Sequence, residues 1–235
     1  MKRTIILIVL AIPLLASEPS PIEDANFLPE TAWNRDDGVL QYTTFFLRDA
    51  AAMELTQEWA ASSPKHQLSY TIPVYNDGET GLGDATLNYR YQLVGDTDSK
   101  LAVAPRLSLV LPTRSAHFGG RASGLQLGVP VSATLTERLA THTNIGGTWF
   151  RESGDKELNL AQSLVFDVTS RIAFSVDAAY TRCPDSEHLF VVRPGVQFTF
   201  EGPRGLTIAP GIALPLGRDR RGVLFVLAVE HPVSR

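Results

Sequence analysis

Cysteine is almost missing from this chain of 235 residues, in which Cys183 is the only one. A single cysteine excludes an intrachain disulfide and cannot by itself form a thiolate metal site. The histidines also lack the spacing of metal ligands; they are His66, His117, His142, His188 and His231. We therefore expect no disulfide scaffold, no metal site and no cofactor.

Long apolar runs are missing as well. One apolar run, at residues 5–16, is shorter than the roughly 18 residues that a membrane-spanning helix requires, and no second run reaches that length. Because Lys2 and Arg3 precede it, this run has the layout of a secretory signal. We predict a cleaved signal peptide at residues 1–16. An uncleaved membrane anchor is the alternative that the length of the run disfavours.

Residues 17–37 are acidic and contain proline without a clear period, which predicts an irregular N-terminal segment in the periplasm. The whole chain has a formal net charge of −4 and no run of lysine or arginine longer than two residues. Surfaces that bind nucleic acid are basic, so this charge argues against nucleic acid as a partner.

What the sequence does contain is a recurrent alternation of apolar and polar residues. At residues 83–94, for example, Leu87 and Tyr89 alternate with Asn88 and Arg90. Successive side chains of a strand point to opposite faces, so this period predicts a strand with one apolar and one polar face. The same pattern predicts about twelve strands, at residues 38–48, 51–60, 66–75, 83–94, 100–112, 124–137, 139–151, 157–168, 171–181, 188–201, 205–216 and 222–232.

The connections between these strands alternate in length. Short ones lie at residues 137–138, 169–170 and 202–204, and longer polar ones at 113–123, 152–156, 182–187 and 217–221. Outer-membrane barrels have short periplasmic turns and long outer loops. We predict an all-β fold: an antiparallel transmembrane β-barrel at residues 38–235, in the outer membrane of a Gram-negative bacterium. A secreted soluble β-sandwich that binds a ligand remains the alternative, because its strands have the same period.

The sequence Gly81-Leu82-Gly83-Asp84 has the look of a phosphate-binding loop. Such a loop needs a following helix whose N-terminal amides hold the anion, and no helical period follows Asp84. We therefore expect residues 78–83 to form a turn.

Four prolines fall inside predicted strands: Pro105, Pro130, Pro194 and Pro210. Proline has no N–H for the strand ladder, and a closed barrel has no free edge where that loss is harmless. We expect bulges or rim positions there, or strand boundaries that differ from those predicted.

Four runs are distinctive: GLGDATLNYRYQL at residues 81–93, LAVAPRLSLVLPT at 101–113, LGVPVSATLTERLATHTNIGGTW at 127–149 and LFVLAVEHP at 224–232. In these runs the chain resembles a family of bacterial outer-membrane β-barrels, the transporters assigned to the meta-pathway of phenol degradation. The likeness covers roughly residues 78–232. The resemblance implies a porin-like passage for small hydrophobic or aromatic compounds and supplies no catalytic residues.

The alternation also predicts which side chains line the lumen, where a substrate would bind. They are Asn88, Arg90, Gln92, Arg106, Asp167, Arg171, Asp177, Glu201 and Glu230. Both signs of charge occur among them. They could set the selectivity of an open pore or pair with one another in a plugged lumen, and a count of twelve strands does not decide between the two.

His142 and Asn144 superficially resemble the histidine site of outer-membrane hydrolases, which requires a hydroxyl nucleophile within hydrogen-bond reach. No serine lies beside them in the sequence, and Thr143 points to the opposite strand face. We therefore expect no enzyme but a passive transporter or channel for small compounds. Its expected partners are outer-membrane lipid, the barrel-assembly machinery and an unidentified small molecule. A structural barrel with a plugged lumen is the alternative.

Overall fold

The computed structural model describes residues 30–34, 38–47, 50–96, 99–119, 122–182, 188–200, 206–216 and 223–233. The predicted signal peptide, most of the predicted segment 17–37, and the residues Cys183 and Glu201 lie outside the described residues. Within the described part of the chain, no helix combines the length and the apolar character needed to cross a bilayer.

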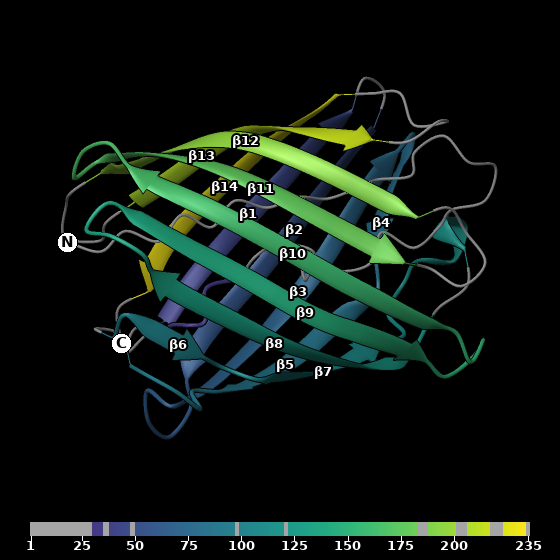
Figure 1. Ribbon diagram of the computed structural model, residues 1–235. Helices are drawn as coiled ribbons and strands as arrows, with labels where there is room; N and C mark the ends of the chain where they lie inside the picture. Colours follow the sequence, from purple (N-terminus) through teal and green to yellow (C-terminus); the bar gives the residue numbers. More distant parts are fainter. Residues whose placement is uncertain are drawn as a thin grey trace.

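The described residues form one antiparallel sheet that closes on itself (Figure 1). Its strands are β1 (Gly38–Leu47), β2 (Ala50–Ala60), β3 (His66–Asp77), β4 (Glu79–Leu82), β5 (Ala85–Tyr91), β6 (Leu101–Val103), β7 (Arg106–Leu111), β8 (Gly124–Thr134), β9 (Leu139–Phe150), β10 (Lys156–Asp167), β11 (Ile172–Arg182), β12 (Leu189–Phe200), β13 (Leu206–Leu216) and β14 (Leu224–Val233). Each long strand pairs with the next, and β1 pairs with β14, so the ring is complete.

The fourteen strands form a ring of twelve wall strands, because two wall strands are each divided into two shorter strands. Both β4 and β5 pair with β3, and both β6 and β7 pair with β8. The prediction of a closed antiparallel barrel of about twelve strands is therefore confirmed.

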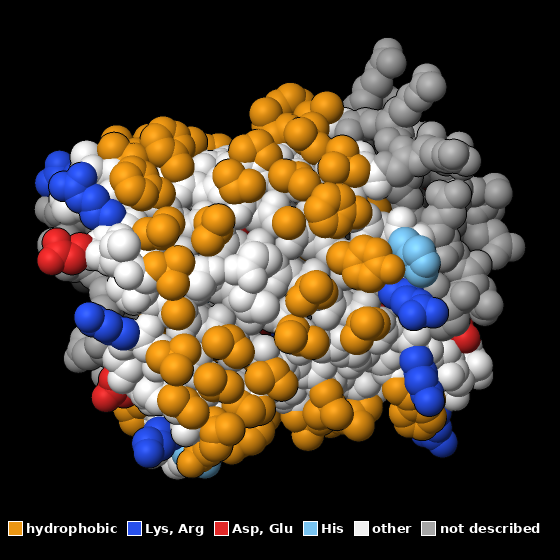
Figure 2. All heavy atoms as spheres, in the orientation of Figure 1, with side chains coloured by type: hydrophobic (Ala, Val, Ile, Leu, Met, Phe, Trp, Pro, Cys, Tyr) orange, Lys and Arg blue, Asp and Glu red, His pale blue; other side chains and the backbone are white. Residues whose placement is uncertain are grey.

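The two faces of the wall differ in polarity, as β10 illustrates. Leu158, Leu160 and Leu164 are exposed on the outside, whereas the alternating Asn159 and Ser163 are buried inside. Figure 2 shows hydrophobic side chains across the middle of one face, with charged side chains towards its two ends. A soluble sandwich would bury its apolar face, so the sandwich alternative is wrong for this chain.

The barrel has two unlike ends. β1 begins and β14 ends at one of them, here called the terminal end, which also carries the turns at residues 61–65, 135–138 and 168–171. The opposite end, here called the loop end, carries the connections at 112–123 and 151–155. Residues 116–118 of the first of these connections form the short 3-10 helix η2 (Ala116–Phe118).

The wall has an irregularity where the sequence predicts a turn. The pairing of β3 shifts by one residue between Val74↔Leu82 and Thr71↔Thr86, so a bulge lies at residues 83–84. The predicted turn at 78–83 is wrong in extent, because residues 79–82 form β4 and the turn centres on Gly78, whose φ is 78°.

The prolines interrupt the ladder without shifting its register. Pro105 lies in the break between β6 and β7, where the pairing with β8 resumes in the same register. Pro194 and Pro210 lie within β12 and β13, at positions that are missing from the otherwise regular pairing of these strands. Pro130 stays within β8, where it is paired with Asn144. The missing N–H groups therefore cost individual ladder bonds and leave the barrel closed.

Candidate functional site

The barrel interior is the candidate site, and most of the predicted lumen residues lie on its wall. Asn88, Arg90, Gln92 and Asp177 are buried there, and Arg106, Asp167 and Glu230 are half-buried. Arg171 differs, because β11 begins at Ile172 and leaves Arg171 exposed in the turn before it. The predicted lumen residue Glu201 lies outside the described residues.

Residues 30–34, here called the plug segment, lie inside the terminal end of the lumen. The backbone N–H of Ala32 donates to Ser132 Oγ at 2.7 Å, and the indole N–H of Trp33 donates to the carbonyl of Ser99 at 2.9 Å. Asn34 Nδ2 donates to the carbonyl of Pro64 at 2.9 Å. Thr31, Ala32, Trp33 and Asn34 are all buried, at 0–7% exposure. The plug segment therefore fills lumen space next to the turns of the terminal end.

Arg90 ties the plug segment to the wall. Its guanidinium has five N–H groups, and each has an acceptor. Nε donates to Asn34 Oδ1 at 2.9 Å. Nη1 donates to Glu30 Oε1 at 2.7 Å and to the Thr31 carbonyl at 3.0 Å. Nη2 donates to Glu58 Oε1 at 3.1 Å and to Gln67 Oε1. Three of these five acceptors belong to the plug segment. All N–H groups of the Arg90 guanidinium are thus hydrogen-bonded, and most of these hydrogen bonds hold the plug segment.

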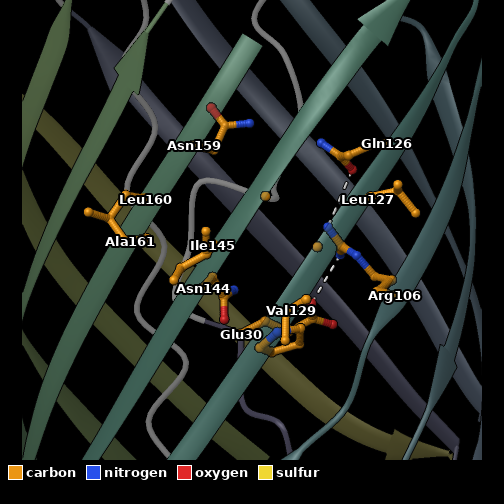
Figure 3. A pocket seen from close by; sticks show the side chains of 13 residues that line it. Glu30, Arg106, Gln126, Leu127, Val129, Asn144, Ile145, Asn159, Leu160 and Ala161 are labelled. Carbon is orange, nitrogen blue, oxygen red and sulfur yellow. Dashed lines mark hydrogen bonds and ion pairs between the residues drawn. The ribbon is translucent and has the colours of Figure 1, made fainter. Parts of the chain in front are cut away.

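Arg106 is the cross-strand partner of Arg90 and borders a cavity in the lumen (Figure 3). Its Nη1 forms an ion pair with Glu30 Oε2 at 3.0 Å, and its Nη2 donates to Gln126 Oε1 at 3.4 Å. The cavity is small and partly open, with about 20 Å³ in which the centre of a water-sized molecule can lie. Its polar lining includes Glu30, Arg106, Gln126, Asn144 and Asn159.

A second buried ion pair crosses the lumen side of β11 and β12. Arg193 donates to Asp177 Oδ2 from Nη2 at 2.7 Å and from Nε at 3.1 Å, and both residues are fully buried. Asp177 was predicted on the lumen face, but Arg193 was not. The signal that could have found it is the alternation of Val191, Arg193 and Gln197 along β12, all three of them buried.

The glycine-rich motif before β5 anchors the connection at 112–123. Asp84, turned inward by the bulge, forms a buried ion pair with Arg114 at 2.9 Å and accepts the backbone N–H groups of Arg114 and Ala122. A Cβ on Gly81 would lie 2.7 Å from Ser115 Oγ, and one on Gly83 would lie 2.6 Å from the ring of Tyr75. The two glycines thus permit close approach of neighbouring groups, and the motif is a clasp for this connection, here called the loop clasp.

A second contact joins the connections of the loop end. Glu152 accepts hydrogen bonds from the hydroxyl of Ser123 at 2.5 Å and from its backbone N–H at 2.8 Å. These bonds favour the ionised carboxylate and lower the pKa of Glu152.

An apolar cluster lines the loop half of the lumen and is here called the apolar wall. It consists of Phe45, Ala52, Tyr75, Ala161, Ala179, Val191, Ala209, Ala213, Leu224, Val226 and Ala228. Phe118 of η2 packs against it, with its ring 5.6 Å from that of Tyr75. The loop half of the lumen is therefore lined largely by apolar side chains, next to the buried ion pairs of Asp84 with Arg114 and of Asp177 with Arg193.

The inference that His142 has no serine within hydrogen-bond reach is wrong. Ser132 on β8 is the cross-strand partner of His142, and its Oγ lies 2.8 Å from His142 Nδ1. Both side chains are fully buried, and Ser132 Oγ also accepts the N–H of Ala32. The edge-on ring of Trp33 lies 5.6 Å from the imidazole. The plug segment therefore covers this pair. Among the described residues, no three His, Cys, Asp or Glu side chains gather in a group that could hold a metal.

Comparisons with known proteins agree with this architecture. A model of the family described as "Putative MetA-pathway of phenol degradation" matches residues 28–201. Two structures of the KdgM porin, one in complex with disordered oligogalacturonate, have TM-scores of 0.61 and 0.60 at 11% and 12% identity, covering 82% of this chain and 98% of each porin. The NanC porin has a TM-score of 0.61 at 12% identity, covering 83% of this chain and 100% of the porin. Comparison with curated proteins by sequence gives no match.

Proposed function

Because the chain belongs to the family described as "Putative MetA-pathway of phenol degradation", we propose that it is a passive channel in the outer membrane of a Gram-negative bacterium for small compounds with an apolar body. The observation that carries this proposal is the apolar wall inside a closed barrel. A lumen that conducts only water and ions has no need of a cluster of apolar side chains, whereas a permeant with an apolar body is stabilised by one. Outer-membrane lipid covers the exposed apolar face in this proposal, and the barrel-assembly machinery inserts the chain.

Uptake by cells without their general porins tests the proposal. Cells that express the chain should take up benzyl alcohol faster than cells that do not. Phe45→Ser, which places a hydroxyl in the apolar wall, should slow this uptake and leave that of arabinose unchanged. Tyr42→Ser, on the outer face of the same strand, is the matched control. Uptake at the background rate by a correctly inserted barrel would contradict the proposal.

The second candidate is a structural barrel with a plugged lumen. The buried plug segment and its bonds to Arg90 favour it. Planar bilayers separate the two candidates: a channel gives conductance steps when the plug segment is displaced, and a structural barrel gives none.

The proposed function involves no covalent chemistry. Ser132 and His142 have the distance of a nucleophile and its base, but the hydroxyl is also bonded to Ala32 of the plug segment. Lipid hydrolysis by the purified protein that disappears in His142→Ala would replace the channel proposal with an enzyme.

A further inference from the structure

Glu30 bridges two arginines that differ in the number of their hydrogen-bond and carboxylate partners. Its Oε1 pairs with Arg90 and its Oε2 with Arg106. Arg90 has acceptors for all its N–H groups and a second carboxylate partner in Glu58. Among the described residues, Glu30 is the one carboxylate within ion-pair distance of Arg106. Removal of Glu30 would therefore leave Arg106, and not Arg90, without a counter-charge.

The anchoring of the plug segment does not depend on Arg106. The segment is held by Arg90, by Ser132 and by the carbonyls of Ser99 and Pro64. The ion pair between Glu30 and Arg106 can therefore open without release of the rest of the segment. Of the contacts of the plug segment, this ion pair is the one that borders the cavity (Figure 3).

The cavity beside Arg106 has the features of a small-molecule site. Asn159 lines it and is buried to 6% exposure, and its Oδ1 atom, an acceptor, has no hydrogen-bond partner and would suit a donor group on the ligand. A Cβ on Gly128 would meet no atom within 4 Å, so the wall leaves open space opposite Arg106. Ala161 lines the cavity and also belongs to the apolar wall. A molecule in the cavity would thus meet a guanidinium, an amide and an apolar surface.

These three surfaces define the ligand chemistry. An arginine fork matches the two oxygens of a carboxylate, and an apolar surface matches a hydrocarbon or aromatic body. We propose that Arg106, whose guanidinium is oriented by Gln126, and the apolar surface at Ala161 form a binding site for a small carboxylate with an apolar body, and that Glu30 occupies its carboxylate position when no ligand is bound. This inference rests on the proposed function and narrows its substrate class to anions.

Calorimetric titration of the folded, detergent-solubilised barrel tests the site, with benzoate as the probe and benzyl alcohol as its uncharged analogue. Glu30→Gln removes the competing charge, which acts at the high effective concentration of a tethered group. Benzoate affinity should rise by roughly tenfold or more, and benzyl alcohol affinity should not change. Glu137→Gln removes the same charge from an exposed turn at the terminal end and should leave both unchanged.

Arg106→Gln provides the second arm. It should abolish the preference for benzoate over benzyl alcohol, whereas Arg106→Lys should retain part of it. A retained heat-modifiable gel band shows that each variant is folded. Unchanged benzoate affinity in folded Glu30→Gln, or a preserved preference in folded Arg106→Gln, would overturn the site. Because binding is measured without transport, a barrel that binds benzoate but does not conduct would contradict the proposed function alone.

Discussion

At the scale of single residues, the interior is organised by a few charged side chains with defined partners. Arg90 could be predicted on the lumen face from the alternation of β5, and its burial agrees with that prediction. Its main partners could not be predicted, because residues 30–34 have no period and the contacts span 56 to 60 residues of sequence. The pairing of Ser132 with His142 was missed for a related reason, since it depends on the register of β8 against β9.

Arg90→Ala should loosen the plug segment, because three of the lost hydrogen bonds end on it. In a background with Trp59→Phe and Trp149→Phe, Trp33 reports on the segment directly. Its emission should shift to longer wavelength and become more accessible to iodide than in the parent. Arg138→Ala, in an exposed turn, is the control and should have the parent spectrum. Identical quenching in folded Arg90→Ala would show that other contacts hold the segment.

Asp177→Ala should destabilise the barrel strongly, because it leaves the fully buried Arg193 without its counter-charge. Loss of one partner of a buried ion pair costs about 3–5 kcal/mol. Removal of both charges in Asp177→Ala/Arg193→Met should recover most of that stability. Urea titration of the folded gel band measures both changes. Equal stability of the single variant and the parent would mean that lumen water solvates Arg193 freely.

At the scale of elements, the strands and the break at Pro105 were predictable, whereas the bulge before β5 was not. The alternation of apolar and polar residues predicted most ends of the twelve wall strands to within a few residues, because every wall strand has one apolar and one polar face. The bulge at 83–84 was not predicted, because the glycines there indicated a turn. Their role follows from the close approach of Ser115 and Tyr75, which only the folded connection creates.

Asp84→Ala should release the loop clasp, because it removes the ion pair with Arg114 and the carboxylate that accepts the backbone N–H groups of Arg114 and Ala122. The connection at 112–123 would then no longer be fixed over the loop end. Liposome swelling in arabinose should become several-fold faster than for the parent. Asp77→Ala removes an exposed charge at the same end and should not change the rate. A swelling rate equal to the parent's would mean that the clasp does not restrict passage.

On the outer face of β10, the free-energy cost of a charged side chain should depend on its depth in the bilayer. Leu160→Arg places a cation near the middle of the strand and should cost about 2–4 kcal/mol in a bilayer. Val168→Arg, in the turn just beyond the strand, should cost about 0–1 kcal/mol. Urea titrations of protein folded into liposomes give the two values. Equal costs at both positions would contradict a lipid-facing outer surface for this strand.

At the scale of the whole molecule, the barrel reverses the usual arrangement of a soluble protein. Its exposed surface is apolar, its interior carries buried ion pairs, and an apolar wall lines the loop half. The plug segment narrows one end and the loop clasp holds a connection at the other. In the proposed channel, a permeant would pass both the ion pairs and the apolar wall, which would favour molecules that combine a polar group with an apolar body.

The central claim is that the chain is an outer-membrane barrel. Its most direct test is the gel mobility of the detergent-extracted membrane fraction, compared with and without boiling. We predict a band in the outer-membrane fraction that migrates differently before boiling, because a closed ring of strands resists detergent until heated. A water-soluble protein with the same mobility in both samples would contradict the barrel, and the channel proposal would fail with it.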